Sequence, residues 1–189
     1  MTPPDENVQF PEALAALEKL LDQYPGVIIG GIASSVLGNI RLTADVDAMI
    51  FASTENIPAI IQTAAELGIT PRIEKAVEFA RKNRVLLLRQ GDSATNIDIS
   101  LGLLPFEKEV IARRQKVAVG SITIPLPTPE DLIIMKAVAN RPKDMLDIQG
   151  ILQAHPSLDR KRIEFWLKQF AEALDRPEIW LEVEKILAG

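Results

Sequence analysis

The stretch that most restricts the fold is a glycine pair between a short apolar run and a short helix. Val27–Ile29 is predicted to form a buried strand, Gly30–Gly31 a tight turn, and the letters IASSVL a helix that ends at Gly38. The glycine spacing differs from G-x-G-x-x-G, and no Gly-Lys-Ser/Thr follows, which argues against a dinucleotide fingerprint and a P-loop. The remaining strand, turn and helix start can hold a phosphate through free backbone N–H groups.

Four further polar or charged residues follow this turn in the sequence. Ser34 and Ser35 lie in the first turns of the predicted helix, where their hydroxyls can add donors to a bound phosphate. Arg41 and Thr43 follow the helix and can also contact phosphate, although Arg41 can equally pair with a nearby acid. The alternative for the whole segment is a tight turn followed by a serine-bearing surface helix, and the turn by itself favours that interpretation.

Three acidic residues lie on predicted strands. Asp45 and Asp47 alternate with Val46 in ADVDAMIF, so the two carboxylates share one strand face, and Asp98 alternates in the same way in NIDIS. If strand 96–101 lies beside strand 45–51, the three carboxylates converge and suit two magnesium ions that hold a triphosphate. The alternative is a solvated strand end, because a D-x-D spacing also arises by chance.

The composition narrows the possible chemistry. The chain of 189 residues has no cysteine and one histidine, His155, which excludes disulfides, thiolate zinc sites and histidine-rich metal sites. Any metal must be held by carboxylates, which favours Mg2+ or Mn2+. The net charge of −5 argues against nonspecific coating of nucleic acid. We expect a cytoplasmic protein without a membrane segment, because the longest apolar stretch, residues 27–38, is short and rich in glycine.

Hydrophobic periodicity predicts an α+β chain. Residues 1–126 are expected to form a mixed α/β domain, and residues 127–189 a helical region packed on it. Helices are predicted at 11–23, 32–37, 55–67 and 72–80, and strands at 27–29, 44–51, 84–89, 96–101, 116–119 and 122–124. Thr128 and Pro129 then start an all-helical part, with helices at 129–139, 142–153, 159–173 and 177–187.

Three strings, taken in order, resemble a known group of enzymes. GGIASSVLGNIRLTADVDAMI, NIDISLG and PTPEDLIIMKAVANRPKDMLDIQGIL are similar to the nucleotidyltransferases of the DNA-polymerase-β-like superfamily. Within that superfamily they look most like the AbiEii-type branch of bacterial toxin–antitoxin systems. The resemblance implies a nucleotidyltransferase-like mixed β-sheet with flanking helices, followed by a C-terminal helical bundle. Many relatives have Gly-Ser where this chain has Gly30–Gly31, so Ser34 or Ser35 is expected to replace that serine.

The resemblance also implies residue roles. Asp45, Asp47 and Asp98 would be the catalytic, metal-binding acids. The nucleotide would be bound by residues of the glycine turn, of the segment before the acids, and of the helical half: Gly30, Gly31, Ser34, Ser35, Arg41, Thr43, Lys136, Asp144 and Asp147. From the residues alone, a lysine on an apolar helix can instead extend to solvent, and Asp144 can simply be a favourable charge at a helix start.

These roles imply a magnesium- or manganese-dependent enzyme that moves a nucleoside monophosphate from an NTP to a hydroxyl and releases pyrophosphate. The acceptor stays open between an RNA 3′ end, a protein and a small molecule, and a cognate toxin or antitoxin is an expected partner. The first alternative is a non-catalytic binding or regulatory protein of the same fold, of the antitoxin kind. The second alternative is a carboxylate-metal phosphohydrolase, which would release inorganic phosphate.

Overall fold

The computed structural model describes the backbone of residues 6–40, 42–91 and 95–188, with side chains from residue 11 onward. The chain forms two compact units. The first comprises Met1–Ile32 and Leu42–Leu126, and the second comprises Ala33–Arg41 and Pro127–Gly189. The helix α2 (Gly30–Leu37) therefore begins in the first unit and continues into the second. The division into domains 1–126 and 127–189 stays a prediction.

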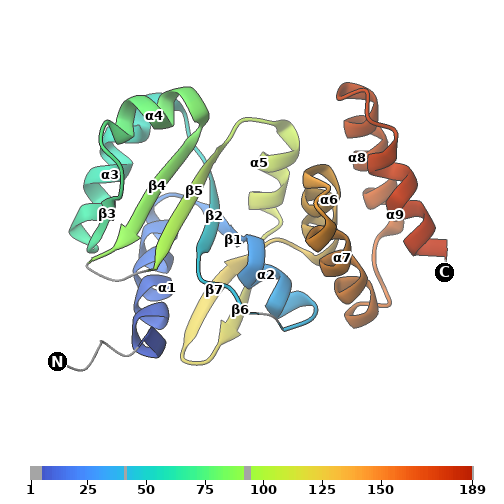
Figure 1. Cartoon of the computed structure of the whole chain (residues 1–189), viewed down its shortest axis with the longest axis horizontal. Coiled ribbons are helices and arrows are strands. Elements are labelled where there is room, and N and C mark those ends of the chain that lie inside the picture. The colour runs from blue at the N-terminus through green and yellow to red at the C-terminus, as the bar shows by residue number, and fades with distance from the viewer. Residues whose placement is uncertain (1–5, 41, 92–94, 189) are drawn as a thin grey trace. The chain divides into compact units, whose positions relative to one another are not determined.

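The first unit is built on a mixed sheet, whose strands are labelled in Figure 1. Among the described residues it has five strands in the order β1-β2-β5-β4-β3. Strands β2 and β5 are parallel, and the other neighbouring pairs are antiparallel. The bounds are β1 (Gly26–Ile29), β2 (Val46–Phe51), β3 (Ile69–Pro71), β4 (Val85–Gln90) and β5 (Asn96–Gly102). With its flanking helices and the helices of the C-terminal part, the structure confirms the predicted fold class.

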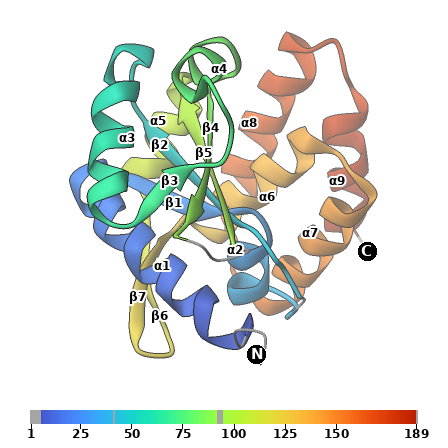
Figure 2. The ribbon, with the colours of Figure 1, turned by 60° about the vertical axis from the view of Figure 1, so that its left-hand side comes forward.

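Alternation along the strands decides which face of the sheet is buried. On β5, Ile97 and Ile99 are fully buried, whereas Asn96 and Asp98, which alternate with them, are half-buried. The helices α1 (Glu6–Gln23) and α3 (Ile57–Glu66) pack on the sheet, and Figure 2 shows them together on one side of it. Because Leu17 and Leu20 of α1 are fully buried, we assign this side to the apolar face. The polar side chains of β5 then lie on the opposite face.

Some elements differ from the prediction. Helix α1 begins at Glu6, so Pro11 lies inside it. The helix predicted at 72–80 is shifted toward the C-terminus as α4 (Ala76–Asn83), and the short strand β3, which was not predicted, precedes it. A further helix, α5 (Pro105–Ala112), lies between the strands predicted at 96–101 and 116–119, where no element was predicted. Its start is stabilised by Glu107 Oε2, which accepts the N–H groups of Leu103 at 2.7 Å and Leu104 at 2.8 Å.

The predicted strand pair after α5 is confirmed. Strands β6 (Gln115–Val119) and β7 (Ile122–Leu126) form an antiparallel hairpin. Gly120 in its turn has a φ of +61°, a left-handed conformation that glycine adopts without steric cost. The hairpin completes the first unit, which ends at Leu126.

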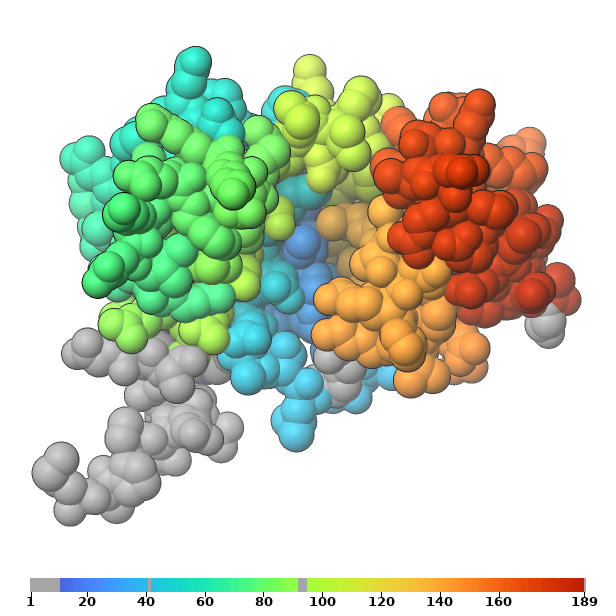
Figure 3. All heavy atoms as spheres, turned by 45° about the horizontal axis from the view of Figure 1, so that its top comes forward, coloured from blue at the N-terminus to red at the C-terminus, as the bar shows by residue number. Residues whose placement is uncertain are grey.

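The second unit is helical. Its bounds are α6 (Pro129–Ala139), α7 (Pro142–Ala154), α8 (Arg160–Ala173) and α9 (Glu178–Ala188). The predicted start of α6 is confirmed, because Thr128 Oγ1 accepts the N–H of Asp131 at 3.3 Å. The buried Asp131 carboxylate also accepts from Arg162 Nε of α8 at 2.7 Å. Figure 3 shows α8 and α9 side by side (red).

Within the described part of the chain, no helix is both long and apolar enough to cross a membrane.

Candidate active site

The glycine turn touches the second acid of the D-x-D pair. Gly30 has a φ of +65°, and a Cβ added there would collide with the carboxylate of Asp47. In the sheet, Ile29, the residue before the turn, lies opposite Asp47. The close approach of this carboxylate and the left-handed backbone therefore both require glycine at position 30. Gly31 is buried as the second residue of α2.

The structure brings the strands of the acids together. Strand β2 lies beside β5 in parallel, with Asp47 directly opposite Asp98, so these two residues lie on one face of the sheet. Asp45 precedes β2 and is exposed, and its Oδ1 accepts an N–H from Asn96 Nδ2 at 3.0 Å. Thr43 Oγ1 donates to the Asp45 carbonyl at 3.2 Å. Asn96 and Thr43 therefore help to hold Asp45 at the start of β2, and Asn96 ties it to the strand that carries Asp98.

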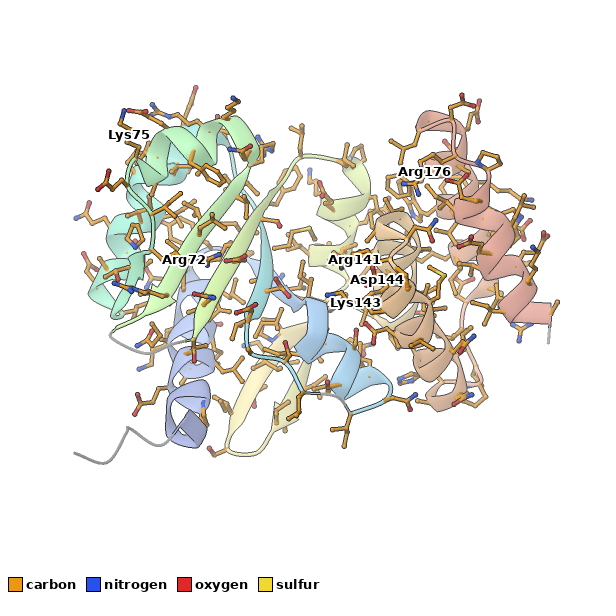
Figure 4. The ribbon with its side chains drawn as sticks, in the orientation of Figure 1. Arg72, Lys75, Arg141, Lys143, Asp144 and Arg176 are labelled. Atoms are coloured by element: carbon orange, nitrogen blue, oxygen red, sulfur yellow. The ribbon has the colours of Figure 1, made fainter. Side chains whose placement is uncertain are left out.

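Asp98 has a cationic partner that the sequence did not indicate. The guanidinium of Arg72, directly after β3, donates to both carboxylate oxygens of Asp98, with Nη2 lying 3.2 Å from Oδ2. Arg72 Nη1 also donates to the Leu88 carbonyl at 3.0 Å, so this side chain reaches across β4 to β5 (Figure 4). Residue 72 was predicted to start a helix. The Ile-Thr-Pro letters before it, typical of a short edge strand, are the signal that could have placed it here.

Whether the acids can bind a divalent cation depends on the oxygen ligands that they offer. Across residues 11–40, 42–91 and 95–188, no three His, Cys, Asp or Glu side chains are grouped closely enough to hold a metal ion. The carboxylates of Asp45 and Asp47 nevertheless supply the oxygen ligands that Mg2+ and Mn2+ prefer, at a solvent-accessible edge. These two acids fit such an ion, while Asp98 is engaged by Arg72. The metal-binding role of all three acids stays a prediction.

The second set of predicted residues forms a buried ion cluster in the helical unit. Lys136 Nζ on α6 donates to Asp144 Oδ1 at 3.2 Å and to Asp147 Oδ2 at 2.7 Å on α7. The exposed fractions are 4% for Lys136, 0% for Asp144 and 7% for Asp147. Arg141 also donates to Asp144, with Nε 2.6 Å from Oδ2, and Figure 4 shows these two residues together at the start of α7. The Lys136 ammonium is thus engaged within its own unit.

The pKa of Asp144 follows from these contacts. Burial opposes ionisation and by itself raises this pKa, but the hydrogen bond from Arg141 and the charge of Lys136 act in the other direction. Together they outweigh burial and lower the pKa of Asp144 below its ordinary value of 3.8. Asp144 is therefore held as a carboxylate.

The other predicted nucleotide contacts lie on α2 or just after it. Ser34 is buried, Ser35 is half-buried, and both belong to the part of α2 in the second unit. Arg41 lies outside the described residues. The nucleotide-binding roles of these residues, like those of Lys136, Asp144 and Asp147, stay predictions.

The fold is similar to that of several solved structures. The crystal structure of ANT(2″)-Ia in complex with adenylyl-2″-tobramycin matches with a TM-score of 0.55 and 17% identity, over 89% of this chain and 98% of that one. An antigenic nucleotidyltransferase-like protein from Paracoccidioides brasiliensis matches with a TM-score of 0.54 and 16% identity, over 95% of this chain and 91% of that one. At these identities the likeness shows a shared fold.

The family assignment comes from the sequence pattern itself. No curated protein matches the chain significantly. A family described as a nucleotidyltransferase of unknown function, DUF6036, matches residues 8–160, which include the glycine turn, the three acids and the Lys136 cluster. The superfamily predicted from the motifs is thereby supported, whereas the AbiEii-type branch stays a prediction. The chain belongs to the DUF6036 family of nucleotidyltransferases.

Proposed function

We propose that this protein is a metal-dependent nucleotidyltransferase that moves a nucleoside monophosphate from an NTP to a hydroxyl and releases pyrophosphate. The observation that carries the proposal is the arrangement of Asp47, which lies opposite Asp98 on parallel strands and against the Gly30 turn. In a chain of a nucleotidyltransferase family, this arrangement supports a triphosphate site at the turn and a metal site at the acids.

The glycine turn is the proposed triphosphate site. The helix dipole favours an anion at the N-terminal end of a helix. Gly30 and Gly31 provide this end in α2, next to Asp47. Ser34, Ser35, Thr43 and Arg41 are proposed as additional contacts, as the sequence predicts.

The acids complete the proposed mechanism. Asp45 and Asp47 would hold the divalent cation, and Asp98 would orient the attacking hydroxyl and accept its proton. We propose a mechanism with two divalent ions at these acids. The ions would neutralise charge on the triphosphate and make the hydroxyl a better nucleophile. The reaction forms an oxygen–phosphorus bond to the hydroxyl and breaks the bond to pyrophosphate. It needs mainly positioning and charge neutralisation, which these side chains can supply.

Finer parts of the proposal come from the sequence resemblance. Membership of the AbiEii-type branch, and with it a toxin–antitoxin role and a cognate protein partner, is part of the proposal. A nucleotide contact by Lys136 would require its ammonium to leave Asp144 or Asp147, which hold it in this structure. For the acceptor, the adenylyl-2″-tobramycin complex of ANT(2″)-Ia makes a small molecule one candidate beside an RNA end and a protein.

The test is calorimetric titration of each of the four NTPs with Mg2+ into wild type, the Asp45→Asn/Asp47→Asn double variant and the matched control Asp22→Asn. Asp22 is an exposed acid on α1. We expect wild type and Asp22→Asn to bind one or more NTPs only with Mg2+, and the double variant to lose this binding. Equal Mg2+-dependent binding by all three proteins would overturn the site. Absence of binding in wild type would favour the non-catalytic alternative.

A further inference from the structure

The residues around the acids form an ordered row across the sheet. From the β1 edge inward, Ile29 lies opposite Asp47, Asp47 opposite Asp98, and Asp98 opposite Leu87 of β4. Arg72 continues this row, because its backbone N–H donates to the Leu87 carbonyl at 3.1 Å. One end of the row is thus the glycine turn after Ile29, and the other end is an arginine.

In this order, the β1 side of Asp47 and the β4 side of Asp98 would have different roles in the reaction. In phosphoryl transfer the attacking and leaving oxygens lie roughly in line, on opposite sides of the phosphorus. If the triphosphate lies at Gly30, the pyrophosphate leaves toward the β1 side of Asp47. The acceptor hydroxyl must then approach from the other side, past Asp98, over strands β4 and β3.

The strands on that approach carry a basic residue and no acidic one. The residues of β3 and β4 include no Asp or Glu, and their one charged residue is Arg89. Arg89 is exposed, and it pairs in register with Asn96, the residue that donates to Asp45. It is two residues from Leu87, so it lies on the same face of the sheet as Asp98. Arg72 has N–H donors beyond those that Asp98 and Leu88 engage.

From this placement we infer that the acceptor is an anion, with a phosphate or carboxylate near its reacting hydroxyl that Arg89 and Arg72 bind. The inference rests on the proposed function, and it selects among the acceptors left open above. Guanidinium groups form strong, geometrically specific pairs with phosphate and carboxylate, and they repel a polycation such as an aminoglycoside. The acceptor is therefore of a different charge class from tobramycin.

The experiment compares three probes on the protein loaded with Mg2+ and a non-hydrolysable NTP analogue. Ribose 5-phosphate carries hydroxyls and a phosphate, ribose is its neutral match, and tobramycin is the cation. Binding is followed through backbone amide NMR signals of β4 and β5. We expect ribose 5-phosphate to shift the signals near Arg89 and to bind at least about tenfold more tightly than ribose, with no saturable effect of tobramycin. A short RNA with a free 3′ hydroxyl, titrated in parallel, distinguishes a polymeric from a small anionic acceptor.

The charge-reversal variant Arg89→Glu and the matched control Lys19→Glu sharpen the test. Lys19 is exposed on α1, the helix assigned to the opposite face of the sheet. We expect Arg89→Glu to weaken ribose 5-phosphate binding at least about tenfold, and Lys19→Glu to leave it unchanged. Three outcomes would overturn this inference and leave the proposed function intact. They are tighter binding of tobramycin than of ribose 5-phosphate, equal weakening of ribose 5-phosphate binding by both variants, and NTP binding without any effect of the anionic probes. Anion binding near Arg89 without Mg2+-dependent NTP binding would instead contradict the proposed function.

Discussion

The molecule contains two groups of acidic residues whose surroundings differ. Asp144 and Asp147 in the helical unit are buried and share the ammonium of Lys136, with Arg141 as a second cation for Asp144. In the sheet unit, Asp45 is exposed, while Asp47 and Asp98 are half-buried on a polar face. Acids that are buried with their counter-charges contribute to the folded state, whereas acids at the surface are accessible to a ligand. The comparison therefore separates a structural cluster from a candidate catalytic one.

The largest expected effect is on the buried cluster. Lys136→Met leaves the carboxylates of Asp144 and Asp147 without their shared cation, and we expect the free energy of unfolding to fall by about 3–5 kcal/mol. The measurement is urea unfolding at neutral pH. Lys143→Met, which removes an exposed lysine from α7, should change this free energy by less than about 0.5 kcal/mol. Equal stability of the two variants would show that the cluster does not stabilise the unit.

Next in size is the effect of a side chain at the glycine turn. Gly30→Ala introduces a left-handed alanine and a collision with Asp47, whereas Gly120→Ala introduces a left-handed alanine with no neighbouring atom within 4 Å. The backbone term costs about 1–2 kcal/mol in both variants. We expect Gly30→Ala to lose more stability than Gly120→Ala and, in addition, to lose Mg2+-dependent NTP binding. Identical unfolding curves for the two variants would contradict the close approach of Asp47.

For Asp47, the acid beside the turn, we expect a smaller change, and it concerns the free energy of NTP binding. Asp47→Asn removes a charge from the acids of the sheet unit, and we expect Mg2+-dependent NTP affinity to fall by about tenfold to a hundredfold. Unfolding should change far less than in Lys136→Met. Calorimetry and urea unfolding on the same samples give both quantities. A loss of stability as large as that of Lys136→Met would remove the distinction between the two groups of acids.

The smallest expected effect is on the pH dependence of stability. Since the pKa of Asp144 is lowered in the folded state, its stabilising contribution is fully present above its ordinary pKa of 3.8 and is lost as the pH falls through the lower, folded-state value. The stability difference between wild type and Asp144→Asn should therefore shrink as the pH is lowered below about 4. Urea unfolding over this range measures it, with Asp22→Asn as a surface control. A difference that grows on acidification would contradict the assigned direction.

The sequence predicted those features that depend on local patterns. Alternation in NIDIS and ADVDAMIF placed Asp98 and Asp47 on strands, and Thr128 with Pro129 marked the start of α6. Local patterns also indicated the glycine turn. The alternation did not predict whether the two strands are neighbours. The structure shows that they are, because β2 and β5 pair in parallel.

Features that depend on distant contacts were not predicted. Arg72 acquires its partner through the antiparallel pairing of β3 and β4, which brings it near a carboxylate far along the chain. The cluster around Lys136 likewise depends on how α6 and α7 pack, so the sequence could indicate the residues but not their mutual contacts. Helix α5 was not predicted, although Pro105 and Glu107 are suitable residues for a helix start.

The route of the chain between its two units has a consequence for synthesis. The end of α2 packs within the second unit, where His155 Nε2 donates to the Leu37 carbonyl at 2.8 Å and a Cβ on Gly150 would collide with Asn39. A ribosome makes residue 37 early and residue 155 more than a hundred residues later. The helix that starts at the glycine turn therefore acquires its last packing partners only when most of the chain has emerged, so a nascent chain that ends at Leu126 would carry the acids with α2 incompletely packed.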